Sequence, residues 1–386
     1  MSAHRVQSAH IAIDASCAAE SPVTGIGYAA IYQMRALLAK SDPRFHFTFF
    51  ASGDQNGREI LRREMGGDKR LVYVPRARLA KYYAWTRLNW PPIEWFTGAA
   101  RIAHNLCHQT PATSRALKLV TVHDLSAFRH PETHTPRMVT VQRTLLRHSA
   151  RYADRLIAVS QHCADELQEV LSVPADKISV IPNGVNIGEF DRPFDDAAFD
   201  NLKLEHDIKR DYLIHVGTIE PRKNLLRLLE AYRIAAQQGD DFPQLVLVGA
   251  VGWNADPILT AIHEMKGNVL RPGYLTRAEV ILLLRGARAC IYPSLYEGFG
   301  LPVLEAMAAR TPVVTSQTTA LPGVAGDAAF YIDPMNVDSI AHALAEIVVD
   351  SDELRRRVEA GRRRAEQLSW EASASKLASL YESLAH

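Results

Sequence analysis

The sequence predicts an α/β protein with two doubly wound domains, each built on a parallel sheet with helices on both faces. Its 386 residues exceed what one ordinary hydrophobic core accommodates, which favours two domains. Short apolar, β-branched runs alternate with longer helical patterns in both halves, as is typical of parallel sheets. A segment rich in turn residues, followed by a change in composition, separates the halves at about residues 182–200.

In the first half, short runs rich in Val, Ile, Leu and Phe predict strands, and apolar residues at helical spacing predict the helices between them. The expected strands are 10–15, 45–51, 71–74, 117–122, 155–159 and 178–181, with helices that include about 27–40, 136–152 and 161–171.

The second half repeats this alternation and ends in a charged helical tail over 353–386. We therefore expect an N-terminal domain over 1–190, a C-terminal domain over 191–370 and a final helix over 371–386. The expected strands of this half are 212–216, 244–248, 269–270, 289–292, 312–315 and 329–332, with helices near 224–238, 256–265, 276–286, 301–309 and 337–349.

Composition narrows the class of protein. Hydrophobic residues make up 47% and charged residues 23% of the chain, as in a soluble globular protein. No apolar run is long enough for a membrane span, and the N-terminus lacks the apolar core of a signal peptide. The four cysteines are scattered without a Cys-x-x-Cys pair, so we expect neither a zinc site nor a disulfide framework, and a cytoplasmic location fits. Basic residues exceed acidic ones in 1–190, and the reverse holds in 191–386, although the net charge is only +1.

The most informative motif spans residues 292–308 and places Glu297 and Glu305 on either side of a Gly-Phe-Gly turn. Gly300 lets the backbone approach a ligand closely, and a helix that opens at Leu301 would direct its N-terminal N–H groups at a phosphate. Carboxylates suit sugar hydroxyls, so the motif indicates a phosphorylated sugar. The alternative is an ordinary strand–helix turn with solvated glutamates.

The spacing of these carboxylates argues against a glycoside hydrolase pair. Such pairs lie roughly 5 to 9.5 Å apart. The helical rise from Leu301 to Glu305 is already about 6 Å, and the turn between Glu297 and Leu301 adds to this separation. Glu297 and Glu305 are therefore expected to hold different parts of one extended ligand.

A second motif, Gly-Thr-Ile-Glu-Pro-Arg-Lys-Asn, begins at Gly217, after an expected strand and before a helix. Arg222 and Lys223 lie near the start of that helix, where its dipole disfavours cations unless an anion is bound. This pattern indicates a polyanion site, and a surface Arg-Lys pair is the alternative.

Three features of the first half are less specific. His123 ends an expected strand, and Asp124 beside it could fix its tautomer or cap a turn, although a lone histidine is more often structural. Gly25 and Gly27 resemble half of a dinucleotide fingerprint, but the acidic residue expected after the second strand is absent, so an NAD site is disfavoured. Residues 76–96 interleave basic and aromatic side chains, which suits an anionic membrane surface or a partly buried helix; no nucleic-acid-binding module accompanies them.

Taken together, these motifs resemble the retaining GT-B glycosyltransferases of family 4, also called glycosyltransferase group 1. The similarity rests on residues 217–224, on 293–309 with its Glu-x7-Glu pattern, and on 315–334. It extends over nearly the whole chain and is most specific in the second half. It implies two Rossmann-like domains facing across a cleft, the first for the acceptor and the second for a nucleotide sugar, with the last helix returning to the first domain.

The resemblance also implies roles for individual residues. Arg222 and Lys223 would hold the donor diphosphate, Glu305 the ribose hydroxyls, and Glu297 would lie against the donor sugar. Other contacts are expected from the backbone of Phe299, Gly300 and Leu301, from the Gly217 turn, from the Gly25–Gly27 loop near the diphosphate and acceptor, from His123 beside the sugar, and from Gly249 and Tyr274 around the base.

In such enzymes the sugar is transferred with retention, the leaving phosphate takes the acceptor's proton, and the two cations take the usual place of a metal. We therefore expect no metal and no cofactor beyond the donor substrate. The pattern most resembles bacterial mannosyltransferases of O-antigen and exopolysaccharide (lipopolysaccharide-type) assembly. This implies GDP-mannose, a glycan or polyprenyl-diphosphate-linked acceptor, and peripheral association with the inner membrane. The alternatives are a UDP-sugar donor, a nucleotide-sugar epimerase and a non-catalytic sensor.

Overall fold

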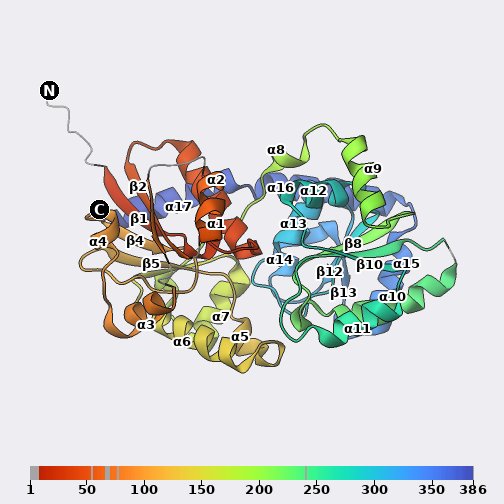
Figure 1. Cartoon of the computed structure of the whole chain (residues 1–386), viewed down its shortest axis with the longest axis horizontal. Helices are drawn as coiled ribbons and strands as arrows, with labels where there is room; N and C mark the ends of the chain where they lie inside the picture. The colour runs from red at the N-terminus through yellow and green to blue at the C-terminus, as the bar shows by residue number, and fades with distance from the viewer. Residues whose placement is uncertain (1–7, 54, 66–69, 76–77, 240, 386) are drawn as a thin grey trace. The chain divides into compact units, whose positions relative to one another are not determined.

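The computed structural model describes residues 8–53, 55–65, 70–75, 78–239 and 241–385. The chain forms two compact units (Figure 1). The first unit comprises Met1–Phe128, Thr140–Gly184 and Trp370–His386, and the second comprises Arg129–Val139 and Val185–Ser369.

The first unit contains a seven-stranded, wholly parallel sheet in the order β3-β2-β1-β4-β5-β6-β7. The order reverses between β1 and β4, and in such sheets ligands bind outside the carboxyl ends of the strands at this point. The strands are β1 Ala9–Asp14, β2 Phe45–Gly53, β3 Leu71–Pro75, β4 Ile102–Asn105, β5 Leu117–Val122, β6 Arg155–Ala158 and β7 Ile178–Val180.

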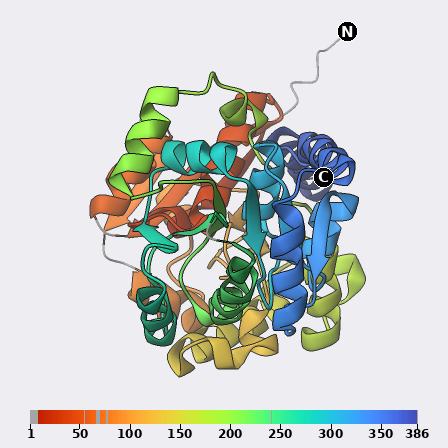
Figure 2. The ribbon, with the colours of Figure 1, turned by 90° about the vertical axis from the view of Figure 1, so that its right-hand side faces the viewer.

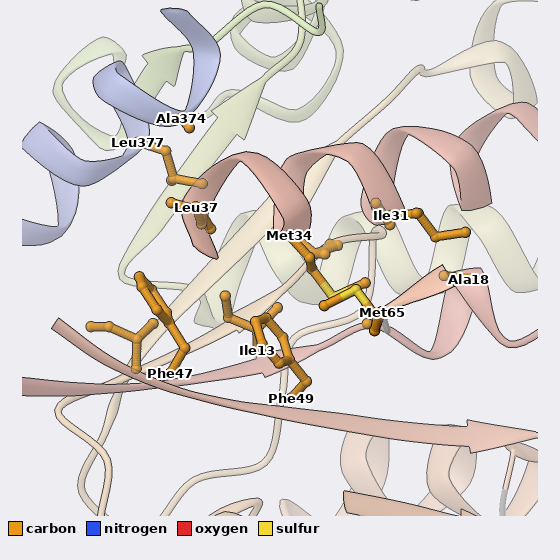
Figure 3. Packing of buried hydrophobic residues seen from close by; sticks show 14 of the residues in the cluster. Ile13, Ala18, Ile31, Met34, Leu37, Phe47, Phe49, Met65, Ala374 and Leu377 are labelled. Carbon is orange, nitrogen blue, oxygen red and sulfur yellow. The ribbon is translucent and has the colours of Figure 1, made fainter. Parts of the chain in front are cut away.

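Helices connect these strands, and the last helix of the chain, α17, packs against α1 of this unit. Figure 3 shows Ala374 and Leu377 of α17 beside Leu37 of α1, above Phe47 of β2. Buried polar contacts add to this packing, because Tyr381 Oη lies 2.7 Å from His104 Nδ1. The helices are α1 Gly25–Lys40, α2 Gln55–Glu64, α3 Arg78–Leu88, α4 Glu94–Thr97, α5 Ser126–Arg129, α6 Pro136–Tyr152, α7 Gln161–Leu171 and α17 Trp370–Ala385.

The second unit has a six-stranded parallel sheet in the order β10-β9-β8-β11-β12-β13. Here the order reverses between β8 and β11, so the loops that follow these two strands lie side by side. The strands are β8 Tyr212–Val216, β9 Gln244–Val248, β10 Val269–Gly273, β11 Ala289–Tyr292, β12 Val313–Ser316 and β13 Ala329–Ile332.

Helices surround this second sheet (Figure 2). Its core is formed by side chains of β8, β9 and β11 together with those of α10, α11 and α15. The helices are α8 Ile187–Phe190, α9 Asp196–Glu205, α10 Leu225–Ala235, α11 Asp256–Glu264, α12 Arg277–Gly286, α13 Leu301–Ala308, α14 Leu321–Ala325, α15 Val337–Ile347 and α16 Asp352–Gln367.

The division into units differs from the expected boundary at residue 190 in two ways. The chain passes into the second unit at Val185, and Arg129–Val139 also belongs to that unit. In this segment, the carbonyl of Thr133 accepts a hydrogen bond from the indole N–H of Trp253 (2.6 Å), and the ring of His134 stacks on Trp253. The hydrogen bond joins residues 120 positions apart, so no local pattern could predict these contacts.

Most expected elements are present, but β4 was not anticipated. Its sequence, Ile-Ala-His-Asn, lacks the β-branched and aromatic enrichment of a strand. All four residues are buried, and the polar ones have partners: His104 lies 2.8 Å from Thr121 Oγ1, and Asn105 donates to Asp14. Buried hydrogen bonding therefore supports this strand where propensity does not.

Candidate active site

The turn after β8 brings two cations against the loop after β11. Residues Pro221–Lys223 form a short 3-10 turn, and Asn224 ends it in the left-handed conformation with φ 60°. The Asn224 amide then donates to the carbonyls of Pro293 (3.1 Å) and Pro334 (2.7 Å). Asn224 thereby holds the 217–224 motif against the loop that carries Glu297.

Glu297 lies between Arg222 and Lys223. Lys223 Nζ donates to Glu297 Oε1 (2.6 Å) and to Tyr292 Oη (2.8 Å). Arg222 Nη1 lies 3.1 Å from Glu297 Oε2 and donates to the Tyr296 carbonyl at 2.7 Å. Lys223 and Glu297 are 74 residues apart, and their contact joins the two sequence motifs in a single charged cluster.

The electrostatics of this cluster keep Glu297 ionised. Burial opposes its charge, but Lys223 and Arg222 outweigh burial and lower the pKa of Glu297 to about 2. Burial and the neighbouring Arg222 lower the pKa of Lys223, although Glu297 and Glu220 partly offset this. Arg222 also pairs with Glu220 at 2.7 Å, so two carboxylates balance two cations in the described site.

Two glycines of the second unit are required by the backbone. Gly300 has φ 106°, and a Cβ there would lie 2.7 Å from Leu321 Cδ2. At Gly249, with φ 150°, a Cβ would lie 2.0 Å from the carbonyl oxygen of Gly217. The turns after β8 and β9 can therefore approach each other this closely only because position 249 carries no side chain. Phe299, in the Gly-Phe-Gly turn of the 292–308 motif, is buried. Leu301 is the first residue of α13, as expected.

Sequence reasoning missed His215, which lies beneath this cluster. It is fully buried, its Nδ1 donates to the Ile291 carbonyl at 2.9 Å, and its ring stacks on Tyr292. Burial lowers the pKa of His215 to about 4, so the imidazole is neutral. Its only sequence signal was a polar residue within the apolar run Tyr-Leu-Ile-His-Val of β8.

Glu305 has a partner that the sequence did not reveal. Arg277 Nη1, from α12, donates to Glu305 Oε1 at 2.6 Å. One oxygen of Glu305 therefore already accepts from the protein, and the predicted contact of Glu305 with the ribose hydroxyls stays a prediction. Tyr274, expected near the base, is 45% exposed and precedes α12.

In the first unit, His123 follows β5 and is nearly buried. Its Nε2 donates to the Leu106 carbonyl at 2.8 Å, so this carbonyl sets the tautomer. Asp124 instead accepts from the backbone and hydroxyl of Ser126 (2.9 and 2.6 Å), which is the turn-capping alternative. Burial lowers the pKa of His123, which favours the neutral ring.

The Gly25–Gly27 loop begins α1. Thr24 caps this helix by accepting from the Gly27 N–H at 3.2 Å. A Cβ at Gly25 would meet nothing within 4 Å, whereas one at Gly27 would lie 2.9 Å from Val23 Cγ1. Gly25 therefore leaves open space above the helix N-terminus, and Gly27 serves packing.

The basic and aromatic segment 76–96 is divided between core and surface. Arg76 lies outside the described residues. Lys81 is buried and pairs with Asp14 at 2.7 Å, so it does not contribute to a basic surface. The exposed side chains of the segment include Tyr83, Arg87, Leu88, Trp90 and Trp95.

The residues that the structure describes contain no cluster of three or more His, Cys, Asp or Glu side chains that could hold a metal ion. None of the helices described is both long and apolar enough to cross a membrane.

Comparison with known proteins agrees with this fold and these motifs. The family model for group 1 glycosyl transferases matches residues 198–364, and that for glycosyltransferase family 4 matches residues 118–189. O-antigen chain mannosyltransferase B of Escherichia coli is 31% identical over 268 residues, which cover 69% of this chain and 70% of that protein. O-antigen chain mannosyltransferase RfbU of Salmonella typhimurium is 27% identical over 229 residues, or 59% of this chain and 60% of that protein.

Among solved structures, HepE of Anabaena in complex with UDP and glucose superimposes with a TM-score of 0.74 at 16% identity, covering 97% of this chain and 99% of that chain. This likeness supports the fold alone. The fold, the motifs and the family matches lead to one conclusion: the chain belongs to the group 1 glycosyltransferases of family 4 and is a glycosyltransferase of the GT-B fold class.

Proposed function

We propose that this glycosyltransferase transfers mannose from GDP-mannose to a glycan or polyprenyl-diphosphate-linked glycan, with retention of configuration, as an α-mannosyltransferase of polysaccharide assembly. The two relatives described above carry the name O-antigen mannosyltransferase, which favours mannose over other hexoses. A family member can differ from its relatives in donor, so the donor requires a direct test.

The observation that carries the proposal is the cluster of Arg222, Lys223 and Glu297 at the reversal point of the second sheet. Lys223 has three N–H donors, and Tyr292 and Glu297 accept two of them. A donor diphosphate would accept further hydrogen bonds from both cations, and the charge that develops on the leaving group would be stabilised there.

This arrangement favours a reaction without a metal ion. The leaving diphosphate would accept the proton of the acceptor hydroxyl on the same face of the sugar, which retains configuration. Glu297 would lie against the donor sugar, and His123 would contribute its carbonyl or its neutral ring. Arg222 and Lys223 would neutralise charge where other enzymes use a divalent metal.

Donor binding and slow donor hydrolysis test the proposal. Calorimetry and product analysis would compare GDP-mannose, UDP-glucose, UDP-galactose and UDP-N-acetylglucosamine, with and without EDTA. We expect selective, EDTA-insensitive use of GDP-mannose, and NMR of a transfer product to show the α-anomer. Loss of activity in EDTA that Mg²⁺ or Mn²⁺ restores would refute metal independence.

A charge-matched pair of variants tests the diphosphate site. Lys223→Ala should weaken GDP binding by at least about 10-fold, because a hydrogen bond to a charged group contributes about 1.5–3 kcal/mol. Arg356→Ala, which removes an exposed cation paired with Glu353 on α16, should leave binding unchanged. If both variants bound GDP with the same affinity, Lys223 would not be part of the diphosphate site.

The alternatives have separate signatures. Preference for a UDP-sugar would keep the site and change the donor. Isomerisation of the donor without any acceptor would indicate an epimerase, and tight binding without turnover in the presence of glycan acceptors would indicate a sensor.

Peripheral membrane association is part of the proposal, through the exposed side chains Tyr83, Leu88, Trp90 and Trp95. Aromatic residues beside basic ones favour the interface of an anionic membrane. Trp90→Ser/Trp95→Ser should reduce sedimentation with phosphatidylglycerol vesicles, whereas Leu204→Ser, at an 80% exposed position of the second unit, should not. Equal vesicle binding by all three proteins would exclude this surface.

A further inference from the structure

We propose that Arg277 is a positioning residue for the nucleoside: it holds Glu305 so that the free side of this carboxylate accepts a ribose hydroxyl. The inference rests on the proposed function, since it concerns the same nucleotide donor. It adds a residue from α12 to the site and a reason for the orientation of Glu305.

Interactions within α12 do not account for a cation at position 277. Arg277 is the first residue of α12, where the helix dipole disfavours a cation. Its guanidinium instead lies between carboxylates of two other elements, with Nη1 2.6 Å from Glu305 Oε1 of α13 and Nε 3.3 Å from Glu189 Oε2 of α8. Figure 1 shows α8, α12 and α13 as neighbours in the second unit.

The contact is partly shielded from water, which makes it stronger than a surface pair. The side chains of Arg277 and Glu305 are 21% and 16% exposed. The guanidinium carbon also lies 5.4 Å from the centre of the Phe190 ring, which restricts its rotation further. Glu305, Glu189 and Phe190 all contact the Arg277 side chain. The Arg277–Glu305 pair therefore loses less side-chain entropy than an exposed ion pair does.

In this geometry one carboxylate oxygen of Glu305 accepts a hydrogen bond from Arg277, and the other oxygen can accept one from a ligand. Within the described chain, Oε1 accepts from Arg277 and Oε2 has no protein donor. An ionised carboxylate offers about four lone-pair sites, so Oε2 can accept from a hydroxyl while Oε1 keeps its partner. Hydroxyl donors of a ribose fit this acceptor, whereas phosphate oxygens do not.

Arg277 also corrects an electrostatic conflict. A nucleoside diphosphate is an anion, and Glu305 is a carboxylate in the helix that opens beside the proposed diphosphate site. Without a cation, the two negative charges would repel each other in a partly desolvated site. Arg277 balances the charge of Glu305 and leaves Oε2 able to accept a hydrogen bond.

The inference predicts coupling between Arg277 and one ribose hydroxyl. Calorimetry would measure the dissociation constants of GDP, 2′-deoxy-GDP and 3′-deoxy-GDP for the unaltered protein and its variants. In the unaltered protein, removal of the hydroxyl that Glu305 accepts should raise the dissociation constant by about 10-fold or more. In Arg277→Gln, GDP itself should bind about 10-fold more weakly, and the loss on removing that hydroxyl should fall below about 3-fold.

Two further variants separate positioning from a structural role. Arg277→Lys keeps the charge and should restore part of the discrimination. Glu189→Gln removes the other carboxylate partner of Arg277 but leaves the contact with Glu305, so the deoxy discrimination should remain. Glu305→Gln should reduce discrimination as Arg277→Gln does.

The possible failures are distinguishable. Full discrimination in a folded Arg277→Gln variant would overturn the role of Arg277 while leaving the proposed function in place. Equal binding of GDP and both deoxy forms by the unaltered protein would overturn the ribose contact of Glu305 and, with it, this inference. If the unaltered protein bound UDP rather than GDP, the corresponding UDP series would decide the same point, and binding of neither would refute the nucleotide site as well.

Discussion

Glu297→Gln provides the most direct test of the charged cluster. The substitution preserves the shape of the side chain but removes the charge that pairs with Arg222 and Lys223 at 3.1 and 2.6 Å. Lys223 would remain buried and Arg222 partly buried, and breaking a buried pair in this way is strongly destabilising. We therefore expect a loss of stability in the second unit at neutral pH.

The magnitude and its pH dependence follow from the depressed pKa. The pKa of Glu297 falls from 4.5 to about 2 in the folded protein, which corresponds to about 3 kcal/mol at 1.36 kcal/mol per unit. Because the folded pKa is the lower one, this contribution is fully present above pH 4.5 and is lost as the pH falls through about 2. At pH 3 about 40% of it should remain.

Hydrogen exchange of peptides that cover β8 and β11 measures the opening free energy of this unit separately from the other. The difference between the unaltered protein and Glu297→Gln should be about 3 kcal/mol at pH 7 and should shrink towards pH 3. Glu359→Gln, at a 58% exposed position paired with Arg310, is the matched control and should change little at either pH. A difference that is independent of pH, or no larger than that of the control, would refute the assigned electrostatics.

Two further predictions concern packing. Gly300→Ala should destabilise the second unit by about 1–3 kcal/mol, because φ is 106° and the new Cβ would lie 2.7 Å from Leu321 Cδ2; thermal or urea unfolding measures this. Tyr381→Phe should cost about 1–3 kcal/mol in the first unit, because it leaves His104 Nδ1 buried without its partner at 2.7 Å. Hydrogen exchange of peptides from β4 and α17 would measure this effect.

Matched substitutions control these two predictions. Gly323→Ala introduces a Cβ with nothing within 4 Å and should be close to neutral, and Tyr152→Phe alters a 49% exposed ring with little effect. A variant that is no less stable than its control would show that the clash or the hydrogen bond has been misjudged.

Features that depend on residues close together in the chain could be predicted from the sequence. Helices α6, α7 and α12 were expected within a residue of their observed ends, because the spacing of their apolar residues is a local feature of the sequence. The glycine turn at Gly300 was expected for the same reason, whereas its left-handed conformation, with φ 106°, is a finding of the structure. By contrast, β4 was missed because its buried polar residues are stabilised by partners distant in sequence.

The proposed active site shows the same division. Residues Arg222, Lys223, Glu297 and Glu305 could be identified from their motifs, and the roles assigned to them remain predictions. Their partners could not be identified, because the contacts depend on strand order. The pairing of β8 with β11 brings Lys223 to Glu297, and the packing of α12 beside α13 brings Arg277 to Glu305.

The sequence by itself therefore determined the alternating α/β architecture, the glycine turns and the family, because each depends on residues close together in the chain. Only the tertiary structure decided that Glu297 is shared between two cations, that Glu305 is already engaged by Arg277, and that Arg129–Val139 belongs to the second unit. The physical reason is that these contacts join segments that are distant in sequence, and the free energy that selects them comes from burying and pairing charge in the folded core.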